Sequence, residues 1–533
     1  MNAKKFVNLT KFLLAGALVL GMTACSSDDN IPKGGTETGA KGYMTVSISN
    51  DAIQRTINDN HSDEGTTAES KINSLAIILV DKANSTISKI IQDATLVATT
   101  NSGSVENVGQ TTKPFQVPAG TYKVYVIANP VADLIGEGKP INVGTAETVL
   151  KSYSGTLSGY ATSNNFMMTN AIDYNNDESS IPSIAVTAAN TESNPAVAST
   201  IHLDRLAVKI NIKSANTGTN VFSFTPSSTI TIHTGATTTT VSNIQINSWT
   251  LLNDIKTAYA FQGWKSATKT LTNDLIATNF FAAFDTTAAY NNTMSSFSIR
   301  TKGGDFVSGY TVLKDSKSTN FTDLTAGSNV KYCLETNPMP VKQFTSSPYT
   351  VTKYENEAPG VLFKATATIN GNSGTSFFSY AGNYYLTLGD IKNAYPNAFA
   401  VGSFDEATTL VDNSKPEYNP STLRTKYGIR YYEGGVMYFT KYLRDQNYST
   451  TYANNTKTGY TVTPLTAAEN YYALMRNSVY NLNINSVNGI GTDIPFGWNP
   501  NETPVDGIND NNTYLRIDVV VNKWASNSYN INF

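Results

Sequence analysis

Short segments in which apolar and polar residues alternate recur along most of this chain. The first covers residues 43–49, where Met44, Val46 and Ile48 take every second position. Successive side chains of a strand point to opposite faces, so this pattern is typical of a β-strand with one face in a core. Similar patterns predict strands over residues 72–80, 123–128, 206–212, 229–233, 436–439 and 479–484, and short helices are expected over residues 131–135 and 467–476.

The alternation continues to the last residues of the sequence. Two apolar sets follow one another there, Leu515, Ile517, Val519 and Val521 and then Tyr529, Ile531 and Phe533. Chain ends usually fray, so an end that keeps its apolar residues in phase is expected to be buried in a sheet. It can be the last strand of its own domain or a strand donated to a neighbouring molecule. The pattern leaves both alternatives open.

Composition supports a β-sheet protein and names no substrate. Hydrophobic residues make up 40% of the chain and charged residues only 15%, with 30 tyrosines and 36 glycines, which favours sheets with many turns. The net charge of −3 indicates neither a nucleic-acid partner nor disorder. With three histidines and no phosphate-binding, dinucleotide-binding or paired-carboxylate motif, we expect no catalytic residue, metal site or cofactor, and therefore no enzyme.

The first 25 residues have the pattern of a bacterial lipoprotein signal. A basic start is followed by an apolar run at residues 12–20 and by small residues before Cys25. We therefore expect residues 1–24 to be removed and Cys25 to carry lipid, with a flexible tether over residues 30–42. The second cysteine, Cys333, lies in an alternating segment and is expected to be a small buried group in a strand. Because the sequence has two cysteines and Cys25 is assigned to lipid, a disulfide framework is excluded.

Two polar stretches divide the rest of the chain. Residues 51–70 have no apolar period and carry one basic residue, Arg55, so we expect an exposed loop between the first strand and the next. Residues 187–199 are equally without period, which predicts a domain boundary near residue 200. Roughly 500 residues are too many for one core. Two antiparallel β-sandwiches in series are therefore expected.

Several segments together carry a resemblance to a known family. They are the lipobox at Cys25, the first strand with its Arg55 loop, the turn and strand at residues 117–126, residues 203–210, 475–482 and 496–500, and the final strand pair. In these segments the chain resembles the Bacteroidetes fimbrillins, the major stalk subunits of FimA-type and Mfa-type fimbriae, or type V pili. The C-terminal segments are most similar to the Mfa-type subunit. The resemblance implies an all-β fold with minor α, as two tandem transthyretin-like β-sandwich domains.

The resemblance also implies a maturation cycle. An Arg-specific protease would cut between Arg55 and Thr56 and remove the strand that carries Met44, Val46 and Ile48. The C-terminal strand of another copy would then fill the vacated groove. The implied divisions are a signal peptide (1–24), a tether and first strand removed on maturation (25–55), an N-terminal sandwich (56–200), a C-terminal sandwich (201–513) and donor strands (514–533).

The implied partners are other copies of the chain in a head-to-tail filament, accessory anchor and tip subunits, the protease, and the outer membrane through the lipid of the precursor. The implied location is the cell outer membrane and then an extracellular fimbrium that supports adhesion and biofilm formation. Two alternatives remain. The chain can be an anchor or tip accessory subunit, or a glycan-binding surface lipoprotein that does not polymerise.

Overall fold

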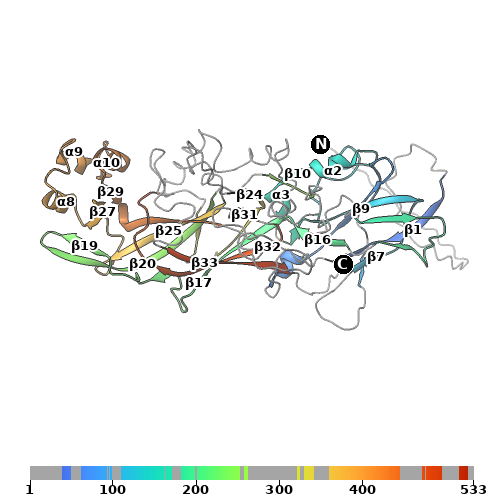
Figure 1. The fold of residues 1–533 in the computed structure, drawn as a ribbon, viewed down its shortest axis with the longest axis horizontal. Coiled ribbons are helices and arrows are strands. Elements are labelled where there is room, and N and C mark those ends of the chain that lie inside the picture. Colours follow the sequence, from blue (N-terminus) through green and yellow to red (C-terminus); the bar gives the residue numbers. More distant parts are fainter. Residues whose placement is uncertain are drawn as a thin grey trace, which may run out of the picture. The chain divides into compact units, whose positions relative to one another are not determined.

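The computed structural model describes residues 39–49, 62–92, 94, 96–98, 110–162, 164–170, 182–198, 201–252, 257–261, 321–324, 329–340, 359–443, 471–474, 476–494 and 515–525. These residues form mostly β-strands with a few short helices, as the sequence predicts (Figure 1). None of the helices among them has both the length and the apolar character needed to span a bilayer.

The N-terminal half of the described chain forms a nine-stranded sheet and a smaller three-stranded sheet. The strands are β1 (Lys41–Thr45), β2 (Ser47–Ser49), β4 (Leu75–Asp81), β5 (Thr86–Ile91), β6 (Leu96–Ala98), β7 (Gln110–Thr112), β8 (Phe115–Pro118), β9 (Gly120–Ala128), β13 (Met168–Asn170), β14 (Ser183–Val186), β15 (Ala196–Val197) and β16 (Ile201–Arg205). The main order is β5-β4-β9-β13-β16-β2-β7-β6, with β14 also paired to β9, and the smaller sheet has the order β15-β1-β8.

The central strands of this sheet are buried on both faces. In β4, Ile77 and Leu79 belong to one apolar core, while Ile78 and Val80 belong to another. A strand covered on both sides needs no polar face, which explains the unbroken apolar run of β4.

Most of the remaining described strands form a five-stranded and a ten-stranded sheet around one large core. The five-stranded sheet has the order β23 (Val330–Leu334), β17 (Ala207–Ser214), β32 (Ser478–Val487), β33 (Leu515–Ala525) and β3 (Ser62–Glu64). The ten-stranded sheet contains β18 (Ser223–Phe224), β19 (Thr231–Thr234), β20 (Thr237–Leu252), β22 (Thr322–Asp323), β25 (Gly360–Ile369), β26 (Asn372–Ser373), β27 (Phe377–Tyr380), β28 (Asn383–Tyr385), β29 (Arg430–Tyr432) and β30 (Val436–Tyr442). Cys333 lies buried in β23, as predicted.

The chain passes from the N-terminal sheets to the five-stranded sheet at one residue, Leu206. β16 pairs with β13 and β2, whereas β17 pairs with β23 and β32. The predicted limit between two domains near residue 200 stays a prediction.

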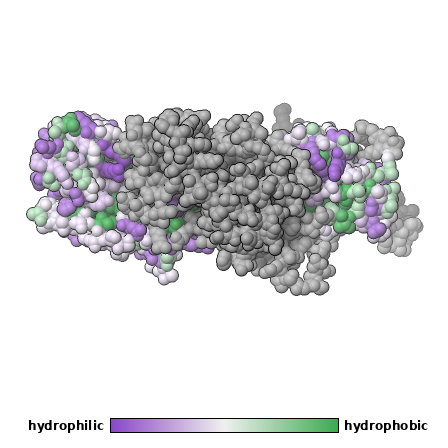
Figure 2. Space-filling model, viewed as in Figure 1, coloured by the Kyte–Doolittle hydropathy of each residue, from purple (hydrophilic) through white to green (hydrophobic). Residues whose placement is uncertain are grey.

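Three small pairs and the helices complete the described elements. The pairs are β10 (Ser154–Thr156) with β21 (Thr257–Tyr259), β11 (Ala161–Thr162) with β12 (Asn165–Phe166), and β24 (Thr336–Pro340) with β31 (Tyr471–Leu474). The helices are α1 (Thr67–Ser70), α2 (Glu147–Ser152), α3 (Leu157–Tyr160), α8 (Leu388–Ala394), α9 (Phe404–Thr409) and α10 (Pro420–Tyr427), with a 3-10 turn η3 (Glu433–Gly435). Over α8–α10, at the left of Figure 2, hydrophilic and hydrophobic residues are interspersed on the face shown.

Both helices predicted from the sequence are wrong. Residues 131–135 form turns, because Asp133 has a left-handed φ of 68° that a right-handed helix cannot contain. Within residues 467–476, the described residues are 471–474, which form strand β31, and 476, which lies in a turn; Tyr471 and Tyr472 of β31 pair with β24. Aromatic residues favour strands, and here the pairing decides the local structure.

One glycine fixes how closely the first strand approaches its neighbour. A Cβ on Gly42 would lie 2.2 Å from the carbonyl oxygen of Thr187, whereas nothing lies within 4 Å of a Cβ on Gly39. We therefore expect Gly42→Ala to lower the free energy of unfolding of the precursor by about 1–3 kcal/mol through overpacking. Gly39→Ala, the matched control, is expected to change it by less than about 0.5 kcal/mol. Denaturant unfolding checks both, and equal effects would contradict the close packing.

Candidate functional site

The first strand lies between neighbours on both of its edges. β1 pairs with β8 in antiparallel and with β15 in parallel orientation, and Met44 stands opposite Phe115 and Ala196. β2 continues between β7, which is antiparallel, and β16, which is parallel. The two halves therefore occupy a continuous slot between two pairs of strands.

Hydrogen bonds also hold Val46, the residue that joins the two halves of the first strand. The amide of Val46 donates to Thr112 Oγ1 over 3.0 Å, and the amide of Thr112 donates to the carbonyl oxygen of Val46 over 2.9 Å. On the other side, the amide of Ala198 donates to the carbonyl oxygen of Thr45 over 3.2 Å. Removing residues 41–49 would therefore break hydrogen bonds along both walls of the slot.

The side chains predicted to be displaced fill this slot. Met44, Val46 and Ile48 are 0%, 0% and 2% exposed and lie in the same core as Val124 and Leu203. Burying a side chain of this size contributes roughly 1.5–3 kcal/mol. Without the first strand, the N-terminal sheets would have an open apolar groove.

The C-terminal strand folds back on its own sheet. β33 pairs along Leu515–Lys523 with β32 in antiparallel orientation. Leu515 and Ile517 are 8% and 3% exposed and belong to the large core. Val519 and Val521 stand in register with Leu482 and Tyr480, and Tyr529, Ile531 and Phe533 lie outside the described residues.

The other edge of β33 is covered only at its end. There, β3 pairs in parallel orientation with residues 523–525, opposite Ser62, Asp63 and Glu64. Among the described strands, none besides β32 pairs with residues 515–522 of β33. Within the predicted donor segment 514–533, residues 515–522 of β33 therefore have one open edge among the described strands.

The predicted processing residues lie outside the described residues. These are Cys25 and the pair Arg55 and Thr56. Residues 50–61 connect β2, which lies in the N-terminal sheet, to β3, which lies on β33.

The exposed loop predicted over residues 51–70 is wrong for its last part. Residues 62–70 form β3 and α1, and Glu69 and Ser70 are buried. A capping box starts α1, because Thr66 Oγ1 accepts from the amide of Glu69 while the carboxylate of Glu69 accepts from the amide of Thr66. The pattern Thr-x-x-Glu at residues 66–69 is a sequence signature of a helix start, and the predicted loop did not take it into account.

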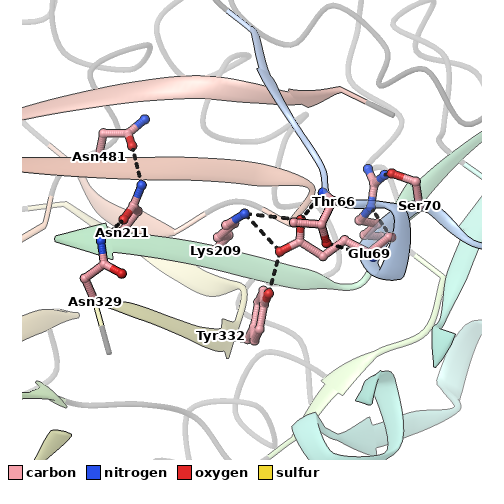
Figure 3. Close-up of polar contacts among 9 residues, drawn as sticks. Thr66, Glu69, Ser70, Lys209, Asn211, Asn329, Tyr332 and Asn481 are labelled. Atoms are coloured by element: carbon pink, nitrogen blue, oxygen red, sulfur yellow. Dashed lines mark hydrogen bonds and ion pairs between the residues drawn. The ribbon is translucent and has the colours of Figure 1, made fainter. Parts of the chain in front are cut away.

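Glu69 is the centre of a buried polar cluster (Figure 3). Lys209 Nζ, from β17, lies 2.9 Å from Glu69 Oε1, and the hydroxyl of Tyr332, from β23, donates to the same oxygen. The ring of Tyr332 packs edge-on against Phe166 at 5.0 Å between ring centres. The cluster joins α1 to two strands of the five-stranded sheet.

The charge of Glu69 is matched by its partners. Burial by itself raises the pKa of this carboxyl, but hydrogen bonds from Tyr332, Lys209 and the Thr66 amide outweigh burial and lower the pKa below its usual value of 4.5. Burial and the contact with Glu69 raise the pKa of Tyr332. The carboxylate thus accepts and the phenol donates throughout the neutral range.

Arg205 attaches the other side of α1. Its Nε donates to the backbone oxygen of Glu69 over 2.9 Å, and its Nη2 donates to Ser70 Oγ over 3.0 Å. Nη1 donates to Asn477 Oδ1 over 3.0 Å, and Asn477 in turn donates to Asp204 Oδ1 over 2.9 Å. The segments 203–210 and 475–482, noted separately in the sequence, therefore meet at this point.

Sequence reasoning did not single out Glu69, Lys209, Tyr332 or Asn477 as site residues. Long separations in the chain hide their contacts, so no local pattern pairs them. The described residues also contain no group of three or more His, Cys, Asp or Glu side chains arranged to hold a metal ion.

Comparison with known proteins gives two family matches. Residues 43–180 match the family model described as major fimbrial subunit protein (FimA). Residues 430–530 match the C-terminal model of fimbrillin, the major fimbrial subunit protein type IV. Both matched segments contain strands of the candidate site: the first contains β2 and residues 43–45 of β1, and the second contains β33. No curated protein matches the sequence significantly.

Solved structures with weak similarity were also found. A candidate cell adhesion protein from Parabacteroides distasonis is 12% identical with a TM-score of 0.43, over 91% of this chain and 100% of that one. A fimbrilin (FimA) from Porphyromonas gingivalis is 13% identical with a TM-score of 0.36, over 91% and 98%. The tip fimbrial protein Mfa3 from Porphyromonas gingivalis is 10% identical with a TM-score of 0.36, over 91% and 100%.

Proposed function

Since this chain belongs, through residues 43–180 and 430–530, to the fimbrillin family of fimbrial subunit proteins, we propose that it is a major stalk subunit that polymerises by donor-strand exchange. It is exported as a precursor with lipid on Cys25, cut between Arg55 and Thr56, and joined to other copies through its C-terminal strand.

One observation carries this proposal. The first strand is buried between strands on both edges, while residues 515–522 of β33 pair on one edge only among the described strands and carry apolar residues at alternate positions. A cut in residues 50–61 would separate the first strand from the rest of the chain. Its loss would leave unpaired strand edges and an apolar groove, a state that strand addition relieves.

The geometry of exchange favours a filament. The groove lies in the N-terminal sheets, and the donor belongs to the five-stranded sheet. A contact between different surfaces of two copies is heterologous, so it leaves a free groove and a free donor for the next copies. Cleavage would then switch the protein from monomer to polymer.

The partners follow from this cycle. Before cleavage they are the outer membrane, through the lipid, and an Arg-specific protease. After cleavage they are other copies, with an anchor subunit at the base and a tip subunit at the far end. The product is a surface fimbrium that supports adhesion and biofilm formation.

A peptide tests the exchange in solution. Purified precursor is cut with an arginine-specific endoprotease, with and without an excess of a peptide covering residues 515–533. We expect a ladder of oligomers without peptide and monomers with it, because the peptide fills the groove. A peptide of the same composition in scrambled order is the control. A ladder that survives the native peptide would contradict strand exchange, and a cut protein that stays monomeric would favour an accessory role.

A further inference from the structure

The segment that follows the proposed cut holds the end of the proposed donor strand. β3, at residues 62–64, pairs with residues 523–525 of β33, and it is the described neighbour of β33 on the edge away from β32. The parallel ladder is only three residues long. A ladder this short depends on what holds its ends in place.

One end of β3 is anchored by α1. Glu69 is 2% exposed and binds Lys209 of β17 and Tyr332 of β23 (Figure 3). Arg205 binds the backbone oxygen of Glu69. These partners belong neither to the first strand nor to β33. The anchor therefore stays with the subunit when either strand leaves.

The other end of β3 is tied to the first strand. Residues 50–61 connect it to β2, which is buried between β7 and β16. A segment whose chain continues into a buried strand has fewer conformations open to it than the same segment at a new chain end, which frays. A cut at Arg55 converts the first situation into the second.

We propose that residues 62–70 form a latch, in which β3 clamps the end of β33 on its own sheet and α1, through Glu69, anchors the clamp. In the intact precursor the latch keeps β33 paired within the five-stranded sheet of its own subunit. Cleavage removes the upstream tie, β3 frays, and β33 becomes free to leave while α1 remains. The role in assembly rests on the proposed function, but the clamp on β33 does not.

The clamp is tested by hydrogen exchange of the full-length precursor. We expect Glu69→Gln to speed amide exchange in residues 515–525 by about tenfold or more, because the anchor loses its charge and its strongest hydrogen bonds. The residues that bind the Glu69 carboxylate lie in α1 and its cap, β17 and β23, so β9 is expected to exchange as in the unchanged protein.

The matched control is Glu147→Gln. Glu147 is also buried and bound by a lysine and a tyrosine, Lys123 and Tyr125, but it lies in α2 over the N-terminal sheet. This variant is expected to speed exchange in β9 and to leave residues 515–525 unchanged. Unchanged exchange of residues 515–525 in Glu69→Gln would overturn the latch. Equal acceleration of those residues in both variants would also overturn it.

A covalent clamp tests release and covers the case in which Glu69→Gln fails to fold. Ser62→Cys with Lys523→Cys joins β3 to β33 at paired positions. The cross-linked precursor is expected to be cut normally but to polymerise only after reduction. Polymerisation with the cross-link intact would overturn the latch. If the cut protein without any substitution does not polymerise, the proposed function fails. The hydrogen-exchange experiment still tests whether β3 clamps β33.

Discussion

Cells that carry Arg55→Lys in place of the natural chain are expected to display only monomer that begins at lipidated Cys25 and is not cut after residue 55. The substitution keeps the positive charge but removes the residue that an Arg-specific protease requires. The first strand then stays in its slot, where Met44, Val46 and Ile48 are buried and bonded on both sides. No groove opens, so we expect fimbriae to disappear from the surface.

Thr56→Ser is the control for this variant, because it changes the residue after the proposed cut and leaves Arg55 in place. Electron microscopy of whole cells and gel analysis of sheared material measure both variants. Normal fimbriae in Arg55→Lys would show that this residue is not the processing site. Loss of fimbriae in both would point to the loop as a whole instead of to Arg55.

Deletion of residues 515–533 is expected to abolish fimbriae while cleavage continues. The subunit then retains its groove but has no donor.

Because the deletion also uncovers part of the large core, a pair of point variants separates donation from folding. Ile517 stands opposite Ile484 in the β32 and β33 pair, and both are buried in the same core.

Ile517→Ala and Ile484→Ala each remove one isoleucine from this pair. We expect each to destabilise the precursor by about 2–4 kcal/mol. Only Ile517 moves to the next subunit in the proposed exchange, so only Ile517→Ala is expected to weaken the polymer against heat or denaturant beyond its effect on the precursor. Equal weakening of the polymer by both variants would indicate that β33 remains paired with β32 of its own subunit.

Alternation of apolar residues predicted the strands well because it reports burial of one face, which is a local property. β1, β2, β9, β17 and β32 all lie where the pattern indicates. The helical region of α8–α10 was missed, although its start signals are present. Thr387 and Asp390 form a capping box, and Asn419 with Pro420 begins α10.

The site depends on contacts that no local pattern contains. β3 and β33 come from opposite ends of the chain and pair in parallel orientation, and Glu69 meets Lys209 and Tyr332 across long separations. From sequence alone, a charged residue such as Glu69 is expected to be exposed to solvent. Glu69 is nevertheless buried, because three hydrogen-bond donors surround its carboxylate. Such pairing is decided by the tertiary fold.

The N-terminal sequence of the polymer tests the central claim most directly. High-molecular-weight material is sheared from the cell surface and its first residues are determined by mass spectrometry. The account predicts a start at Thr56, without the strand that carries Met44, Val46 and Ile48. A polymer that begins at lipidated Cys25 and retains that strand would contradict cleavage-triggered strand exchange.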